Sequence, residues 1–129
     1  MSGKILALDY GKKRIGVAIT DPDQTVAFPR EVWKGKTNSE VLETLENLIK
    51  EEKVCGIVVG LPLALTGEKT AQTRETEVFI ETLSHLGVPI HTMDERWTTI
   101  QADLTGGDDA VAAQILLKTY LDKCAKILP

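Results

Sequence analysis

The chain has 129 residues, of which 43% are apolar and 26% charged, a balance typical of one globular domain that we expect to span residues 1–129. A net charge of −4 excludes a protein that coats nucleic acid through overall positive charge, although a local basic patch can still hold phosphates. The longest apolar stretch, 54–65, is too short and too interrupted by glycine and proline to span a membrane, and residues 1–4 lack the layout of a signal peptide, so we expect a cytoplasmic protein.

The first part of the chain predicts three strands joined by short turns. Residues 4–10 and 14–20 are apolar runs separated by a tight Gly-Lys-Lys connection, so they should pair as an antiparallel hairpin. An Asp-Pro-Asp turn signal then precedes a third expected strand at 25–32. Pro29 within that strand marks an edge or a bulge, because proline cannot donate to a sheet.

The rest of the chain predicts alternating helices and strands. Apolar residues recur at helical spacing from 39 to 52, with Asn38 or Ser39 as the expected N-cap. The run at 54–60 lacks alternation, which indicates a central strand covered on both faces. The later elements are expected as a helix at 70–86, a strand at 88–93, a short helix near 99–104 and a final helix at 109–127. This order predicts an α/β fold: a mixed five-stranded sheet with helices on both faces.

Asp9 is the most informative residue of the chain, because it is a carboxylate inside an apolar strand. It shares a strand face with Ile5 and Ala7 by two-residue alternation. Burying a carboxylate is costly unless it is paired, hydrogen-bonded or bound to a cation. Either Asp9 is a structural acid neutralised by a basic residue such as Arg14, or it belongs to a functional site.

Glu95 follows the expected strand at 88–93. Strands connected by helical crossovers are parallel, so their carboxyl ends gather at one edge of the sheet, where ligand sites collect. Asp9 lies near the end of the first strand, which should pair with the strand at 54–60. Glu95 can therefore reach the same edge, unless Asp94 and Glu95 serve only as turn or cap residues before a helix with Thr98 as its N-cap.

Asp109 opens the last expected helix and belongs to its buried stripe. Counting on by three, four, seven and eight residues gives Ala112, Ala113, Leu116 and Leu117. Small residues at 112 and 113 would let the helix approach the sheet closely. The alternative is that Asp108 and Asp109 are present because acids are favoured at a helix N-terminus.

Three acids that can converge predict a divalent metal site. Hard cations such as Mg²⁺ take carboxylate oxygens, and two such ions can activate a water and stabilise the leaving oxygen of a phosphodiester. Lys12, Lys13 and Arg14 lie beside Asp9 and form either a phosphate-binding patch or a solvated hairpin turn.

Four segments together resemble the motifs of the YqgF/RuvX family, in the order in which that family carries them. They extend from about residue 4 to about residue 121, and each alone is a weak signal. The matching residues are Leu8 to Ala18, Val59 to Leu63 with Gly67, Asp94-Glu95-Arg96 with Thr98-Thr99, and Asp109 with Ala112-Ala113 and Ile115-Leu116.

The resemblance implies a ribonuclease H-like three-layer fold and a metal-dependent nuclease. Such an enzyme would process the 5′ end of precursor 16S rRNA or resolve Holliday junctions, acting on structured RNA or branched DNA as a monomer or homodimer. By motif position, Asp9, Glu95 and Asp109 would be the catalytic ligands of Mg²⁺ or Mn²⁺. Charge and placement further suggest phosphate contacts from Lys12, Lys13, Arg14 and Arg96. Gly60 would line the substrate cleft from the end of the strand at 54–60. Thr98 and Thr99 would either hydrogen-bond to phosphate or cap a helix.

The segment between Thr99 and Asp109 departs from the family pattern. It is short and contains no lysine or arginine, whereas family members usually carry a longer and often basic segment there. This departure favours an alternative in which the chain is a non-catalytic nucleic-acid or protein binding domain. A further alternative is a phosphate-binding half of an actin-like or sugar-kinase ATPase, which also places a hairpin of this type first.

Overall fold

A computed structural model describes residues 3–11, 13–95 and 109–127 of the chain, with side chains to residue 124. Its five strands form one sheet in the order β3-β2-β1-β4-β5. Strand β1 pairs antiparallel with β2 and parallel with β4, while β2–β3 is antiparallel and β4–β5 is parallel. The strands are β1 (Lys4–Tyr10), β2 (Arg14–Thr20), β3 (Ala27–Lys34), β4 (Val54–Leu61) and β5 (Ile90–Asp94).

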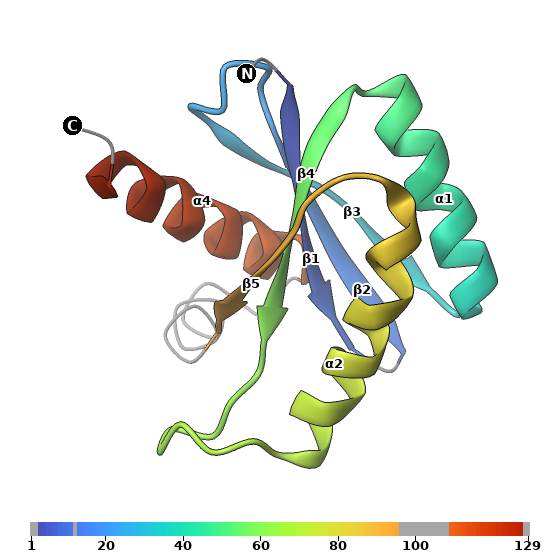
Figure 1. Ribbon diagram of the computed structural model, residues 1–129, viewed down its shortest axis with the longest axis vertical. Helices are drawn as coiled ribbons and strands as arrows, with labels where there is room; N and C mark the ends of the chain where they lie inside the picture. Colours follow the sequence, from blue (N-terminus) through green and yellow to red (C-terminus); the bar gives the residue numbers. More distant parts are fainter. Residues whose placement is uncertain (1–2, 12, 96–108, 128–129) are drawn as a thin grey trace.

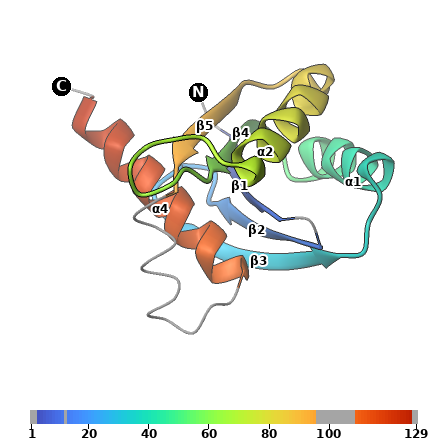
Figure 2. The same ribbon diagram turned by 90° about the horizontal axis from the view of Figure 1, so that it is seen from below.

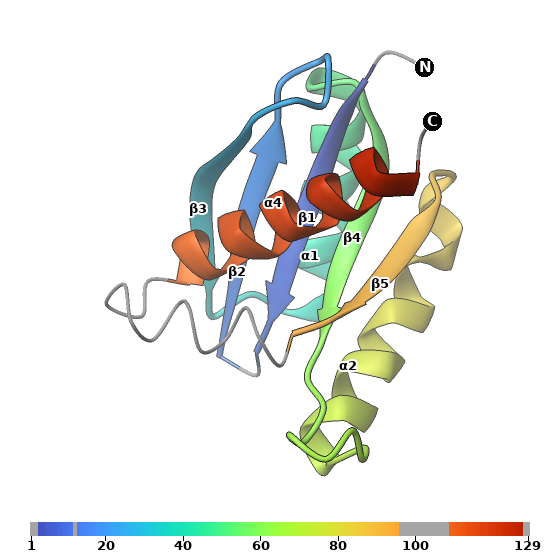
Figure 3. The same cartoon turned by 90° about the vertical axis from the view of Figure 1, so that its left-hand side faces the viewer.

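Helices cover both faces of this sheet. Figures 1 and 2 show two helices on one face and a single helix across the other, and Figure 3 shows that single helix in front of the sheet. The mixed sheet between two helical layers confirms the predicted fold class. None of the helices in the described part of the chain is long and apolar enough to span a membrane. The paired helices are α1 (Asn38–Glu51) and α2 (Ala71–Thr82), the latter continued by a 3-10 turn η1 (Leu83–Leu86), and the single helix is α4 (Asp109–Ile127).

The two faces of the sheet are packed with side chains of different size. The face under α1 and α2 carries large apolar residues such as Leu8, Ile57 and Trp33. On the face under α4, the buried sheet residues include Ala7 and Ala18. Burial of the apolar side chains on both faces is the main term that stabilises the sheet.

Strand β3 begins and ends two residues later than the sequence predicts. The Asp21 carboxylate accepts hydrogen bonds from the backbone N–H of Thr25 (2.7 Å) and of Val26 (2.9 Å), which holds these residues in a turn instead of a strand. The prediction for Pro29 is confirmed: β3 is an edge strand, and the register with β2 shifts between Ala18, opposite Pro29, and Val17.

Helix α1 is capped by Thr37, and not by Asn38 or Ser39 as the sequence analysis predicted. The Thr37 hydroxyl accepts from the backbone N–H of Glu40 (3.2 Å), and the Glu40 carboxylate accepts from the N–H of Thr37 (3.0 Å). This reciprocal pair is a capping box, and the Thr-x-x-Glu spacing is the sequence signal for the N-terminus that the structure shows.

The helix expected at 70–86 and the strand expected at 88–93 both differ from the structure at their ends. The α-helix stops at Thr82, and a 3-10 turn leads to Gly87, whose φ of 79° ends it in the left-handed region. Pro89 has no N–H for a sheet, and β5 starts only at Ile90. The short helix expected near 99–104 lies outside the described residues.

Candidate active site

The carboxyl ends of β1, β4 and β5 meet at one edge of the sheet, as the sequence analysis predicted. Asp9 lies near the end of β1, opposite Gly16 of β2. Leu8 is opposite Val59 of β4, which places Asp9 beside Gly60. Because neighbouring strand residues face opposite ways, Asp9 lies on the α4 face while Tyr10 faces α1 and α2. An acid from the first strand therefore meets the end of the central strand.

Glu95 follows β5 directly and is only 7% exposed. Its backbone N–H donates to the carbonyl of Leu61 (3.2 Å), which fixes the residue beside the end of β4. The side chain then lies over Gly60: a Cβ placed there would be 2.2 Å from Glu95 Oε1. Residue 60 must lack a side chain for the Glu95 carboxyl to reach Asp9.

Asp109 is the first residue of α4, and its backbone lies against β2. A Cβ added to Gly16 would be 2.0 Å from the carbonyl oxygen of Asp109. Since Gly16 is the strand partner of Asp9, this close approach brings the third acid to the same part of the sheet. Gly16 lies within the Leu8 to Ala18 motif, and a glycine inside an apolar strand is a sequence signal of such close backbone approach.

Asp9 and Glu95 share a proton across a side-chain hydrogen bond. Burial, the hydrogen bond to Asp9 and the negative charges of Asp9 and Asp94 raise the pKa of Glu95 to about 9. Burial also raises the pKa of Asp9, with the hydrogen bond from Glu95 opposing it and the charge of Asp109 adding to it. The raised pKa keeps Glu95 protonated at neutral pH, so its carboxyl can donate to Asp9 and the pair avoids carrying two negative charges.

Asp109 pairs with Arg14. The distance from Arg14 Nε to Asp109 Oδ2 is 3.5 Å, and the side chains are 61% and 34% exposed. A pair this accessible contributes little to stability, about 1 kcal/mol or less. Arg14 therefore pairs with Asp109. The alternative in which Asp9 is only a structural acid required a basic residue such as Arg14 to pair with Asp9 itself.

The donor set suits a hard divalent cation, because all three acids offer only oxygen ligands. In the part of the chain that the structure describes, however, no three His, Cys, Asp or Glu side chains are arranged to hold a metal ion. Asp9 and Glu95 are in contact, while Asp109 is turned to Arg14. Two of the three predicted ligands are therefore in contact, while the third pairs with a basic side chain.

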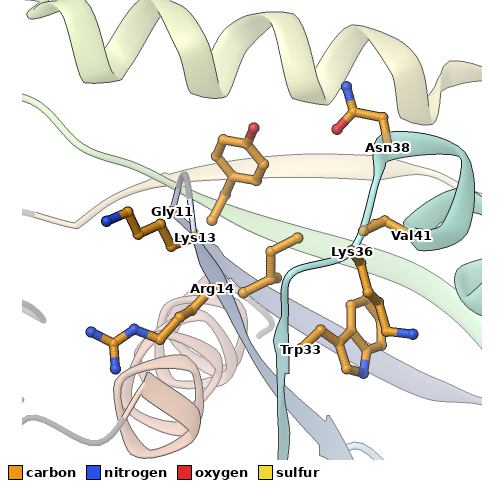
Figure 4. Close-up of a pocket in the computed structure, with 9 residues that line it drawn as sticks. Gly11, Lys13, Arg14, Trp33, Lys36, Asn38 and Val41 are labelled. Carbon is orange, nitrogen blue, oxygen red and sulfur yellow. The ribbon is translucent and has the colours of Figure 1, made fainter.

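Of the predicted substrate residues, the structure describes Lys13, Arg14 and Gly60. Lys13 and Arg14 are exposed and border a small cavity of about 30 Å³ between the β1–β2 hairpin and the start of α1 (Figure 4). Gly60 lies under the Glu95 carboxyl, and its role in lining the cleft stays a prediction. Lys12, Arg96, Thr98 and Thr99 lie outside the described residues.

Comparison with known proteins gives one sequence family and two sets of relatives. The family described as "RuvX: Holliday junction resolvase" matches residues 3–123. A protein of Maridesulfovibrio salexigens named "Putative pre-16S rRNA nuclease" is 40% identical over 131 residues, covering 92% of this chain and 97% of its own length. A protein of Rickettsia peacockii with the same name is 35% identical, with 95% and 88% covered.

Among solved structures, the fold is similar to that of RuvC from Thermus thermophilus bound to a Holliday junction substrate. The TM-score is 0.62, with 95% of this chain and 96% of that chain covered. A second structure of the same protein gives a TM-score of 0.61. Sequence identity is only 11% in both, so this similarity establishes the ribonuclease H-like fold and nothing about residues.

Proposed function

The chain belongs to the RuvX family, and on that premise we propose that it cuts precursor 16S rRNA near its 5′ end, with Asp9, Glu95 and Asp109 as its catalytic acids. As a member of this family it is a nuclease, a hydrolase acting on phosphodiester bonds. The rRNA substrate follows the name shared by relatives that match nearly the whole chain. The family description makes a four-way DNA junction the second candidate substrate.

The observation that carries this proposal is the Asp9–Glu95 pair. Two carboxyl groups in a half-buried site that hold one proton between them form a place where a divalent cation can replace that proton. We propose Asp9, Glu95 and Asp109 as the ligands of Mg²⁺ or Mn²⁺. For all three acids to bind the cation, the Asp109 carboxylate must exchange its contact with Arg14 for one with the cation. When bound at these residues, a divalent cation would supply Lewis-acid chemistry, which activates a water and stabilises the leaving oxygen.

The basic residues near these acids are the proposed contacts to the substrate backbone. Arg14, once released from Asp109, can donate its guanidinium N–H groups to a phosphate. Lys13 extends from the same exposed hairpin. We extend this proposal to Lys12, Arg96, Thr98 and Thr99 from the sequence. We also propose that residues 1–129 are one domain that acts in the cytoplasm, as a monomer or a homodimer.

The test is a cleavage assay with and without metal. Purified protein is incubated with Mg²⁺, Mn²⁺ or EDTA and with a precursor 16S rRNA fragment, a four-way DNA junction or a DNA duplex. We expect metal-dependent cleavage of the rRNA fragment that Asp9→Asn abolishes. Asp23→Asn removes an exposed acid from the turn before β3 and is the matched control, which should cut as the wild type does.

Each other outcome identifies a different function. Cleavage of the junction alone would reassign the substrate to branched DNA. Binding of any of the three substrates with no cleavage under any metal would identify the non-catalytic binding domain. Hydrolysis of ATP without strand scission would identify the kinase-like phosphate-binding half.

A further inference from the structure

A basic cavity lies at the same edge of the sheet as the acids but on the opposite face. Tyr10 marks that face, because its ring stacks on Phe79 of α2 with ring centroids 4.2 Å apart. Asp9, the preceding residue, faces α4. The cavity is bordered by both ends of the β1–β2 hairpin and by the connection from β3 to α1. Its lining residues are Tyr10, Gly11, Lys13, Arg14, Ile15, Trp33, Lys36, Asn38 and Val41.

Backbone geometry joins the two loops that carry the basic residues. Gly35 has a φ of 65°, a left-handed conformation that favours glycine, and turns the chain between β3 and α1. Its N–H donates to the carbonyl oxygen of Lys13 (3.4 Å). The turn brings Lys36 to the cavity that Lys13 and Arg14 border, so residues distant in sequence share one hollow.

The residues that line this cavity suit an anion better than a base. It contains three basic side chains and no acidic one. The nearest acid of α1, Glu40, is engaged in the capping box, and its pKa is lowered chiefly by its hydrogen bond with the Thr37 backbone and slightly by Lys36. Trp33 is 5% exposed and forms the floor, so it offers no face on which a base could stack.

The basic residues form a track from the acid face to this cavity. Arg14 lines the cavity and also reaches Asp109 on the α4 side. Figure 4 shows Lys13 and Arg14 with their charged ends on one side of the hairpin, and Lys36 and Asn38 on the other. A nucleic-acid strand held at the acids and continuing over the hairpin would pass these groups in turn.

We propose that the cavity is a second phosphate site, which takes a backbone phosphate of the substrate at a distance from the scissile bond. This rests on the proposed function, since the strand that fills it is the one held at Asp9 and Glu95. Lys36 and Asn38 are its new residues, and they contact the substrate without taking part in bond cleavage. The site reads backbone charge alone and therefore adds affinity without sequence preference.

Binding is measured in an Asp9→Asn background, so that cleavage plays no part. The probe is a 5′-labelled precursor 16S rRNA fragment, titrated at several salt concentrations. We expect Lys36→Ala to raise the Kd about 3- to 10-fold and to lower the slope of log K against log salt by about 0.7 to 0.9, the effect of losing one phosphate contact. Lys50→Ala, which removes an exposed lysine at the far end of α1, is the matched control and should stay within about twofold of its parent.

A methylphosphonate scan then locates the contacted phosphate. One phosphate at a time is neutralised. We expect one position at which neutralisation weakens binding by the parent but causes no further loss of binding by Lys36→Ala. Equal binding by Lys36→Ala and Lys50→Ala, or no such position, overturns the second site. Lys36-dependent binding of inorganic phosphate with no such position would identify a free-anion site and also overturn it.

The two proposals fail in different ways. If the wild type cuts RNA while Lys36→Ala and Lys50→Ala bind alike, only the second site is wrong. If no substrate is cut but the Lys36→Ala defect and its methylphosphonate position persist, the phosphate site stands and the catalytic proposal is wrong.

Discussion

The two faces of the sheet differ in what they contribute to the protein. Under α1 and α2, large side chains such as Leu8, Ile57 and Leu45 form a continuous apolar core. Under α4, alanines at 7 and 18 accompany the half-buried Asp9 and the buried Glu95. One face maximises apolar burial. The other gives up part of that burial so that a helix and three acids can approach the sheet.

Because the two faces differ in this way, we expect stability and activity to be separable in this fold. Buried acids with raised pKa values cost folding free energy, and such costs are typical of functional sites. Substitutions on the α1/α2 face should therefore reduce stability and leave chemistry intact. Substitutions of the acids on the α4 face should do the reverse.

The largest expected effect belongs to Glu95→Gln. We expect cleavage to fall about 10³-fold or more, because the amide cannot release a proton to supply the negative oxygen ligand that we propose for Glu95. The metal-free protein should gain about 1 to 3 kcal/mol in unfolding free energy at pH 8, since the amide needs no proton to remain buried. Cleavage rates and urea unfolding in EDTA measure the two effects. A variant that loses both stability and activity would contradict the expectation that the two faces contribute separately to stability and to activity.

Leu45→Ala tests the opposite face. Leu45 is fully buried under α1, so the truncation should cost about 2 to 5 kcal/mol of unfolding free energy. Cleavage per folded molecule should stay unchanged at a temperature where the variant is native. Glu46→Ala, at the neighbouring exposed position, serves as the control and should change stability by less than about 0.5 kcal/mol.

Gly60→Ala tests the acid site at a single position of β4. Its Cβ would lie 2.2 Å from Glu95 Oε1, so the carboxyl must move, and we expect cleavage to fall about 10- to 100-fold. Gly56→Ala is the matched control in β4, because its nearest neighbour, the carbonyl oxygen of Pro89, is 3.8 Å away. Similar rates for the two variants would contradict the role assigned to Gly60.

The smallest expected effect is the pH dependence of stability without metal. The folded pKa of Glu95, about 9, exceeds the ordinary value of 4.5, so the folded state keeps a proton that the unfolded chain releases. Stability is then fully present below about pH 4.5 and is lost as the pH rises toward 9. Between pH 6 and pH 8 we expect a fall of about 1 to 3 kcal/mol, measured by urea unfolding in EDTA.

A variant that removes the proton isolates this contribution. Glu95→Gln should flatten the profile over the same interval. The acids with lowered pKa values, Asp21, Glu40 and Glu52, act in the opposite direction and only at lower pH. An equal slope in both proteins would assign the titration to other groups.

Most of the sheet could be predicted from the sequence because its signals are local. The strands at 4–10 and 14–20 and the start of the helix at 109 agree with the structure, since apolar runs and helical spacing define them. The start of β3 could not be predicted in this way. It depends on the hydrogen bonds that the Asp21 side chain makes to Thr25 and Val26, which compete with strand pairing.

The placement of Asp9 and Glu95 could be predicted from the sequence, but the basic partners of the acids could not. Asp9 and Glu95 were expected at one edge of the sheet, and parallel pairing of β1, β4 and β5 brings them there. Which acid meets which basic residue depends on side-chain directions that spacing does not specify. The Asp109–Arg14 pair and the contact of Glu95 with Gly60 are tertiary features of this kind.

The order of the elements along the chain also has a consequence for biosynthesis. Asp9 leaves the ribosome about 100 residues before Asp109, so a nascent chain holds its first acid well before the third is synthesised. The α1/α2 face can assemble from residues 4–94 before the helix that covers the other face, α4, has been synthesised. A nuclease ordered in this way brings its three proposed catalytic acids together only after α4 has been synthesised.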